Sequence, residues 1–311
     1  MHSESSTEGP TGQYESVSCN LCGGTDLATV LPATQRSEAP LEVRFKSSSD
    51  EKLHDSLVAC RSCGLQFVNP RLRPDVILGG YRDGTDETFV SQASARERTF
   101  ATALNMIERL APHRGHILDV GTAAGAFLHV ARVRGWTVSG CEPNTWLGGW
   151  GKRTYGIDIQ PGTLFAQHYA DGAFDVVTVW DVLEHTHDPQ GFLGECQRVL
   201  KPGGLLVVNV PDIGSWLARL MGRHWLMLLS THLYYFTRQT LGQMLQRVGF
   251  QVVRMKPHVQ WLELGYVIKR GGPVGGGVVR VAGKLVRGVG AGGLHVPYWV
   301  GQTVAISRKQ G

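Results

Sequence analysis

Short apolar runs alternate with amphipathic segments through the middle of this 311-residue chain. The apolar runs cover residues 116–120, 136–140, 156–160, 173–180 and 205–210, and helical patterns cover 126–134 and 189–200. Strands that alternate with helices form a parallel sheet with right-handed crossovers. We therefore predict an α/β fold with a doubly wound, Rossmann-like sheet, in which ligands bind beyond the carboxyl ends of the strands.

Two features at these strand ends indicate an adenosine-containing ligand. The run 116–120 leads into Gly121-Thr-Ala-Ala-Gly125 and then a helix, so that backbone and a helix N-terminus can approach a ligand closely. The second run leads into Glu142, which is placed to accept hydrogen bonds from both ribose hydroxyls. The glycine turn alone would also serve NAD or FAD, and Glu142 could instead be a surface residue in a loop.

Four cysteines form two C-x-x-C pairs near the N-terminus. Cys19 and Cys22 are one pair, and Cys60 and Cys63 are the other. Four thiolates at this spacing are typical ligands of a structural zinc ion. We expect a small zinc-ribbon-like module over residues 19–70, stabilised by the metal because its polar sequence could not build a core. Two redox disulfides or four ordinary thiols are the alternatives.

The remaining composition sets bounds on the compartment and the partners. Residues 1–18 are polar, which we interpret as a flexible tail without a signal peptide. No stretch has the roughly 18 uninterrupted apolar residues of a membrane-spanning helix, so we expect a cytoplasmic protein. Residues 71–115 are interpreted as a linker and a helical lead-in. The formal net charge of +5 permits an anionic substrate without requiring one.

Four segments occur in an order that carries a family resemblance. They are Leu118-Asp-Val-Gly-Thr-Ala-Ala-Gly125, Gly140-Cys-Glu-Pro143, Phe174-Asp-Val-Val177 with Asp181-Val-Leu-Glu-His185, and Leu200-Lys-Pro-Gly-Gly204. Over about residues 116–250 the chain resembles the class I S-adenosylmethionine-dependent methyltransferases. The double C-x-x-C resembles the zinc-binding modules of a subset of these enzymes, often found among sugar and natural-product methyltransferases. Ala123 departs from the family pattern, which usually has glycine there.

The resemblance implies a methyltransferase domain over residues 116–311. Its seven-stranded sheet would end in an antiparallel hairpin, here residues 250–255 and 300–308. S-adenosylmethionine would lie with its methionine part against Gly121 and Gly125 and its ribose on Glu142. Adenine would lie near Thr163 and Leu164, after the third strand. The expected cofactor-binding residues are Asp119, Gly121, Gly125, Glu142, Thr163, Leu164, Trp180 and Asp181.

The acceptor side is predicted from the segment His232-Leu-Tyr-Tyr-Phe-Thr237, which approaches the active-site mouth in many related enzymes. A transferase that removes a proton from a hydroxyl needs a base, and histidine suits neutral pH. His185 and His232 are the candidate catalytic bases, and Tyr234 and Tyr235 are candidate pocket residues. A structural role for each histidine, or transfer without any base, is the alternative.

A basic, glycine-rich insertion at about residues 257–299 interrupts the last hairpin. Arg280, Lys284 and Arg287 share one helical face, which suits contact with an anionic membrane or a lipid-linked substrate. The interpretation that we favour is a cationic surface helix packed on the domain.

Together these patterns predict methyl transfer from S-adenosylmethionine to a small-molecule acceptor such as a sugar, natural-product or lipid-linked metabolite. A hydroxyl is the expected acceptor group, with carbon and amine left open. A nucleic-acid methyltransferase is disfavoured because no Asn/Asp-Pro-Pro-aromatic motif follows the fourth strand. The sequence also leaves open an NAD(P)-dependent oxidoreductase and a non-enzymatic scaffold with a degenerate cofactor site.

Overall fold

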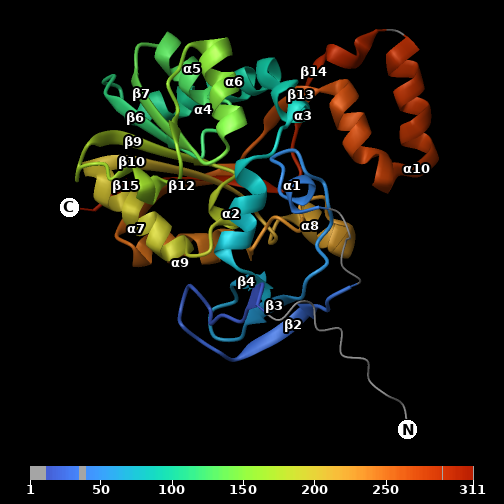
Figure 1. Ribbon diagram of the computed structural model, residues 1–311, viewed down its shortest axis with the longest axis horizontal. Coiled ribbons are helices and arrows are strands. Elements are labelled where there is room, and N and C mark those ends of the chain that lie inside the picture. Colours follow the sequence, from blue (N-terminus) through green and yellow to red (C-terminus); the bar gives the residue numbers. More distant parts are fainter. Residues whose placement is uncertain (1–11, 35–39, 289, 311) are drawn as a thin grey trace.

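The computed structural model describes residues 12–34, 40–288 and 290–310. Within these residues, the central sheet has seven strands in the order β12-β15-β10-β9-β6-β7-β8 (Figure 1). Their bounds are β6 (His116–Val120), β7 (Thr137–Glu142), β8 (Gln160–Pro161), β9 (Phe174–Trp180), β10 (Leu200–Pro211), β12 (Phe250–Pro257) and β15 (Gln302–Lys309). β15 is antiparallel to both of its neighbours, and the other pairs are parallel. The predicted Rossmann-like sheet with an antiparallel last strand is confirmed.

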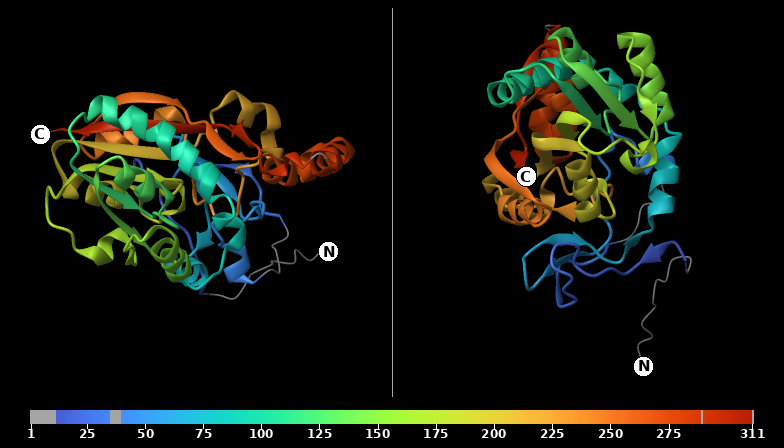
Figure 2. Two further views of the ribbon diagram at one scale, coloured as in Figure 1. Left: turned by 90° about the horizontal axis from the view of Figure 1, so that it is seen from above. Right: turned by 90° about the vertical axis from the view of Figure 1, so that its left-hand side faces the viewer.

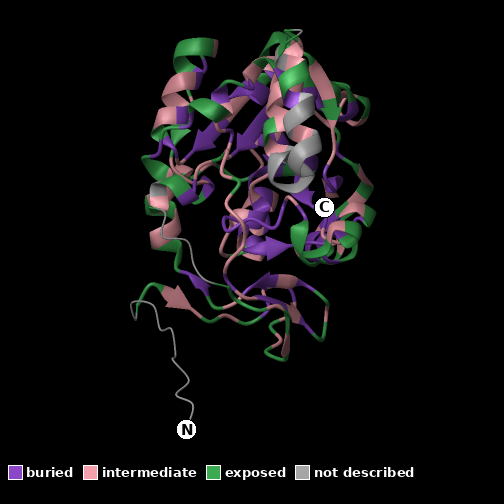
Figure 3. Ribbon diagram, turned by 90° about the vertical axis from the view of Figure 1, so that its right-hand side faces the viewer, coloured by how far each residue is buried: buried purple, intermediate pink, exposed green. Residues whose placement is uncertain are grey.

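Helices cover both faces of this sheet (Figures 1 and 2). Ile117 and Val176 point into a core cluster that α4 and α5 complete, whereas Leu118 and Val177 point into the cluster on the other face, under α7 and α9. This alternation is the period-2 pattern of a strand buried on both sides. Figure 3 shows buried residues along the strands of the sheet. The helix bounds are α4 (Ala93–Leu110), α5 (Ala126–Val133), α6 (Thr145–Tyr155), α7 (Pro189–Val199) and α9 (Arg238–Arg247).

The expected third strand, residues 156–160, is wrong in its position. Gly156 adopts a left-handed backbone conformation (φ +63°) and ends α6, so residues 157–159 form a connection and β8 begins at Gln160. Asn144 begins the same helix by accepting a hydrogen bond from the Leu147 N–H. Capping at both ends of α6 therefore determines where the strand can start.

The N-terminal module shares a sheet with the larger domain. Its strands β2 (Leu27–Leu31), β3 (Leu57–Cys60) and β4 (Gln66–Val68) are antiparallel, and β4 also pairs with β11 (Tyr234–Tyr235). In Figure 1 this sheet lies below the central sheet, and the short helix α1 (Leu41–Arg44) lies above it, near α2. The module is thus joined to the larger domain by backbone hydrogen bonds.

Two of the predicted segments contain regular structure. Of the expected tail, residues 1–11 lie outside the described residues, but β1 (Tyr14–Glu15) pairs with β5 (Arg71–Leu72). The expected linker after residue 71 contains α2 (Pro74–Arg82) and α3 (Glu87–Val90) before α4 begins.

The insertion forms a second hairpin with a long helix between its strands. β13 (Gln260–Glu263) pairs with β14 (His295–Tyr298), and α10 (Leu264–Gly288) lies beyond them, at the right of Figure 1. Lys284 and Leu285 are exposed, whereas the side chains of Arg280 and Arg287 are outside the described part of the structure, so the basic face stays a prediction. Among the described residues, no helix has both the length and the apolar character that are needed to cross a membrane. This holds for α10 and for the short helix α8 (Trp216–Met221).

Arg71 is the buried side chain that connects β1, β5 and β11. Its Nε donates to Glu15 Oε1 at 2.8 Å and its Nη1 donates to the Tyr234 hydroxyl at 2.9 Å. We expect Arg71→Ala to lower the free energy of unfolding by about 1–3 kcal/mol, because it removes a buried side chain with hydrogen bonds to Glu15 and Tyr234. The exposed Arg73, which pairs with Asp75, is the matched control, and its replacement by alanine should change stability by less than about 0.5 kcal/mol. Urea denaturation measures both, and equal effects would contradict this role for Arg71.

Candidate active site

A cavity of about 560 Å³ opens at the carboxyl ends of the parallel strands. Gly121 and Ala123 line it after β6, Glu142 at the end of β7, and Trp180 and Asp181 at the end of β9. Residues of the N-terminal module and of α2 close another side, namely Phe45, Lys46, Ser47, Ser49, Pro74, Ile77, Leu78 and Tyr81. The cavity therefore lies where the fold places ligands, and the first 82 residues help to enclose it.

Glu142 is buried at the floor of this cavity. Its Oε2 accepts the Ala123 N–H at 2.8 Å, and its Oε1 accepts the Asn144 N–H at 2.8 Å. Burial raises the pKa of Glu142 to about 7, against the lowering effect of these two N–H groups. The Tyr81 side chain also hydrogen-bonds to this carboxylate. A carboxylate has about four acceptor sites, so the residue can still accept a hydrogen bond from a ligand hydroxyl.

The glycine turn before α5 has two positions that limit side-chain size or shape. Gly121 has a φ of +67°, and a Cβ there would lie 2.6 Å from Val182 Cγ2. Ala123 also has a positive φ, +49°, which costs an L-residue about 1 kcal/mol and explains why glycine is usual at this position. The turn nevertheless forms with alanine, and its N–H reaches Glu142.

The other four expected cofactor residues outside the cavity wall of Trp180 and Asp181 differ in where they lie. Thr163 and Leu164 line the cavity after β8, as predicted for the adenine end. Gly125 does not line it: this residue is the N-cap of α5, with a φ of +78°. Asp119 lines the cavity but is buried under the turn, where it accepts the Thr178 hydroxyl at 2.6 Å, and burial raises its pKa to about 7.

Trp180 and Asp181 form the centre of the cavity wall. Trp180 packs against Phe127 and stacks with His258. Asp181 has a φ of +54° and accepts hydrogen bonds from the side-chain amides of Asn209 at 2.5 Å, Gln260 at 3.2 Å and Gln302 at 3.3 Å. These three donors come from β10, β13 and β15, so they fix the orientation of the carboxylate across the sheet edge.

His185 and His232 meet in the lining of the same cavity. Their ring centroids are 4.8 Å apart in an edge-to-face arrangement. The Nδ1 of His185 contacts the Thr231 carbonyl at 2.8 Å, and the Nδ1 of His232 contacts the Met227 carbonyl at 2.9 Å. A carbonyl oxygen cannot donate, so each Nδ1 carries the proton and each Nε2 has a free lone pair. Burial lowers the pKa of both rings, and that of His232 falls well below its usual range.

Tyr234 and Tyr235 are not lining residues of this cavity, contrary to expectation. Both are buried in β11, where the Tyr234 hydroxyl donates to the His187 carbonyl at 3.1 Å and the Tyr235 hydroxyl donates to the Leu229 carbonyl at 2.9 Å. Strand pairing with β4 turns these side chains into the core between module and domain.

Several lining residues were not found by sequence reasoning. Arg96 of α4 is packed over the Phe89 ring, and Arg270 reaches the cavity from α10. Glu184, between the singled-out Asp181 and His185, has both carboxylate oxygens buried without a hydrogen-bond partner among the described residues. Glu184 belongs to the motif Asp181-Val-Leu-Glu-His185, so the sequence could have marked it as a site residue. Only the fold shows that its side chain lines the cavity.

Residues 93–255 match the sequence profile of a family described as a methyltransferase domain, which is more than half of the chain. The chain belongs to this methyltransferase family. The predicted S-adenosylmethionine-dependent enzyme class is thereby confirmed.

Similar proteins agree with this assignment. The methyltransferase is 28% identical over 72% of its length to an O-methyltransferase of Pyrenophora dematioidea, covering 86% of that protein. It is 29% identical over 30% of its length to a ubiquinone biosynthesis O-methyltransferase of Rhizobium leguminosarum, covering only 38% of that protein. A solved S-adenosylmethionine-dependent methyltransferase from Archaeoglobus fulgidus, 17% identical, aligns with 72% of this chain and 100% of its own, with a TM-score of 0.50, which supports the fold.

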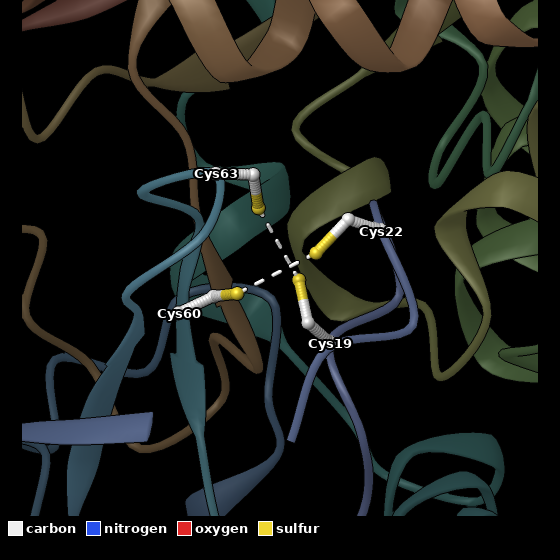
Figure 4. A group of neighbouring side chains, drawn as sticks. All are labelled: Cys19, Cys22, Cys60 and Cys63. Carbon is white, nitrogen blue, oxygen red and sulfur yellow. Dashed lines mark hydrogen bonds between the residues drawn. The ribbon is translucent and has the colours of Figure 1, made fainter. Parts of the chain in front are cut away.

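The four module cysteines of the methyltransferase come together outside the cavity (Figure 4). Their Sγ atoms lie within 4.8 Å of one another, with Cys19 3.5 Å from Cys63 and Cys22 3.5 Å from Cys60. Gly23 and Gly64 each take a positive φ just after a cysteine pair, which lets both turns fold back. All four are free cysteines in this structure.

The carboxylate of Glu142 should control cofactor affinity. We expect Glu142→Gln to weaken S-adenosylmethionine binding roughly 10–100-fold, because an amide cannot accept hydrogen bonds at both of its ends. Binding to the unaltered protein should also weaken as the pH falls below about 7, since protonation removes the same acceptor capacity. Calorimetry measures both effects. Glu195→Gln, which changes a carboxylate paired with Arg198 on α7, is the matched control and should bind normally.

Proposed function

We propose that this methyltransferase transfers the methyl group of S-adenosylmethionine to a hydroxyl of a small-molecule acceptor bound at the histidine wall of the cavity. The observation that carries the proposal is the pair of imidazoles, His185 and His232, which present lone pairs to the same cavity that contains Glu142 and the glycine turn. Cofactor and acceptor would thus meet inside one enclosure.

The residues present fit the cofactor. Glu142 would accept the ribose hydroxyls, Thr163 and Leu164 would flank adenine, and the turn at Gly121 would contact the methionine part. When bound, S-adenosylmethionine supplies an electrophilic methyl group on a positively charged sulfur. Trp180 and Asp181 are then placed to face that charge, with Asp181 held by three amides.

The chain's own contribution to the reaction is positioning, enclosure and proton removal. Phe45 and Tyr81 close the cavity from the N-terminal side, which favours exclusion of water from the reacting atoms. Without a bound metal, the acceptor hydroxyl would lose its proton at the histidine pair, whose Nε2 atoms are unprotonated. A hydroxyl acceptor is also supported by the O-methyltransferase from Pyrenophora dematioidea.

A panel of acceptors tests this proposal. We expect release of S-adenosylhomocysteine with hydroxylated metabolites such as phenols, sugars and polyketides, and none with RNA or DNA. His232→Asn should lower kcat about 10²–10⁴-fold while cofactor affinity stays unchanged. His129→Asn, on α5 beside Tyr155 and outside the cavity, is the matched control and should retain activity. Methylation of nucleic acid alone, or full turnover in His232→Asn, would contradict the proposal.

We also propose that the four cysteines hold one structural zinc ion. A tetrahedral ion with Zn–S bonds of about 2.3 Å needs sulfur–sulfur distances of about 3.8 Å, close to the observed spacing. Four thiolates leave no position for water or substrate, so the ion would stabilise the module rather than react. The first knuckle also contacts the larger domain, since Asn20 Nδ2 donates to Asp188 Oδ1 at 2.9 Å.

Metal content and stability test the zinc proposal. Purified protein should contain one zinc ion per chain, and Cys22→Ser should lose it and lower the melting temperature. Cys196→Ala, a buried cysteine of α7 outside the cluster, should keep the zinc. A metal-free protein that unfolds at the same temperature before and after zinc addition would refute the idea.

A further inference from the structure

Glu184, His185 and His232 form a cluster of three electron-pair donors. One ligand atom from each residue lies within 4.8 Å of the other two. Both histidine Nδ1–H groups are used on backbone carbonyls, so their Nε2 lone pairs remain. Glu184 is completely buried, and neither of its oxygens has a hydrogen-bond partner among the described residues.

A charged carboxylate in this position is costly, because it is buried and a second carboxylate, Asp181, lies near enough to repel it. A buried charge normally pairs, binds a metal or becomes neutral. Within the described residues, no lysine or arginine forms an ion pair with Glu184, although Arg270 lies near enough to act on His232. A cation that accepts electron pairs from all three residues would satisfy the carboxylate and both imidazoles together.

We propose that Glu184, His185 and His232 bind a divalent first-row metal ion that holds the acceptor hydroxyl. Two neutral imidazoles and one carboxylate are the ligand set of open Zn²⁺, Mn²⁺ and Fe²⁺ sites. Three protein ligands leave at least one position free, and all three residues line the cavity. The site is distinct from the four-cysteine cluster, whose ligands would be saturated.

The supporting contacts have the form expected around metal ligands. Each ligating histidine donates its other N–H to a backbone carbonyl, which fixes its tautomer and ring orientation. The Leu233 N–H donates to the Glu184 carbonyl at 2.8 Å. The short helix η2 (Leu183–His185) is therefore fixed to residues 231–233, and the three side chains are held together before any ligand arrives.

This inference rests on the proposed function but changes the proton acceptor, because the Nε2 atoms of His185 and His232 would then hold the metal. A metal-bound hydroxyl is more acidic than a free one, so its O–H bond breaks with the proton passing to a water molecule. The oxygen then forms the new O–CH₃ bond as the S–CH₃ bond breaks, releasing S-adenosylhomocysteine. The metal changes neither its oxidation state nor its protein ligands.

Manganese titration of the full chain, zinc-loaded at its cysteines, tests the site. Mn²⁺ prefers oxygen and nitrogen ligands over thiolates, so it reports on the cavity cluster. Electron paramagnetic resonance of free Mn²⁺ should show one bound ion per chain. Glu184→Gln and His232→Asn should each weaken binding at least about 10-fold. His258→Asn, a buried histidine of the same cavity outside the cluster, is the matched control and should bind normally.

Thermal unfolding gives a second readout that does not depend on activity. Mn²⁺ should raise the melting temperature of the unaltered protein but not that of Glu184→Gln. The inference is overturned if neither Mn²⁺ nor a second equivalent of Zn²⁺ binds. It is also overturned if Glu184→Gln and His232→Asn bind Mn²⁺ with the same affinity as the unaltered protein. Titration of S-adenosylmethionine in the same samples separates the two proposals. Normal cofactor binding, together with methylation of a hydroxyl acceptor in the presence of EDTA, would refute the metal site and leave the proposed function in place.

Discussion

The carboxylate of Glu142 connects the parts of the fold that create the cavity. By accepting the Ala123 and Asn144 N–H groups, it ties the turn after β6 to the start of α6. The Asn144 side chain in turn donates to the carbonyls of Tyr81 and Gly84, which holds α2 over the cavity. Loss of the carboxylate would therefore disturb both the floor and one wall of the cavity.

The N-terminal module acts as a wall of the active site. Residues next to α1 and on α2 line the cavity, and β11 places residues 231–233 beside η2 while pairing with the module sheet. The cysteine cluster lies elsewhere, but the sheet that it anchors continues into this strand. Metal at the cysteines would thus affect the acceptor side through the shared sheet, without touching the substrate.

The strands β6, β7, β9 and β10, the glycine turn and the place of Glu142 after β7 could be predicted from sequence, because local apolar runs and turn chemistry determine them. The cysteine cluster could be predicted because C-x-x-C spacing restricts geometry within a few residues. The position of Tyr234 and Tyr235 could not, since it depends on a strand pairing with residues about 170 positions earlier. Likewise, the local sequence could not show that the buried Glu184 carboxylate lacks a hydrogen-bond donor among the described residues, because any such donor would have to come from a distant segment.

Parallel titration of the purified protein with S-adenosylmethionine and with NADH, by calorimetry, tests the central claim most directly. The account predicts saturable binding of S-adenosylmethionine with one site per chain, competed by S-adenosylhomocysteine, and no binding of NADH. Binding of NADH alone would contradict it, because the cavity would then serve the dinucleotide chemistry that a glycine turn and an acidic residue after the second strand can also support.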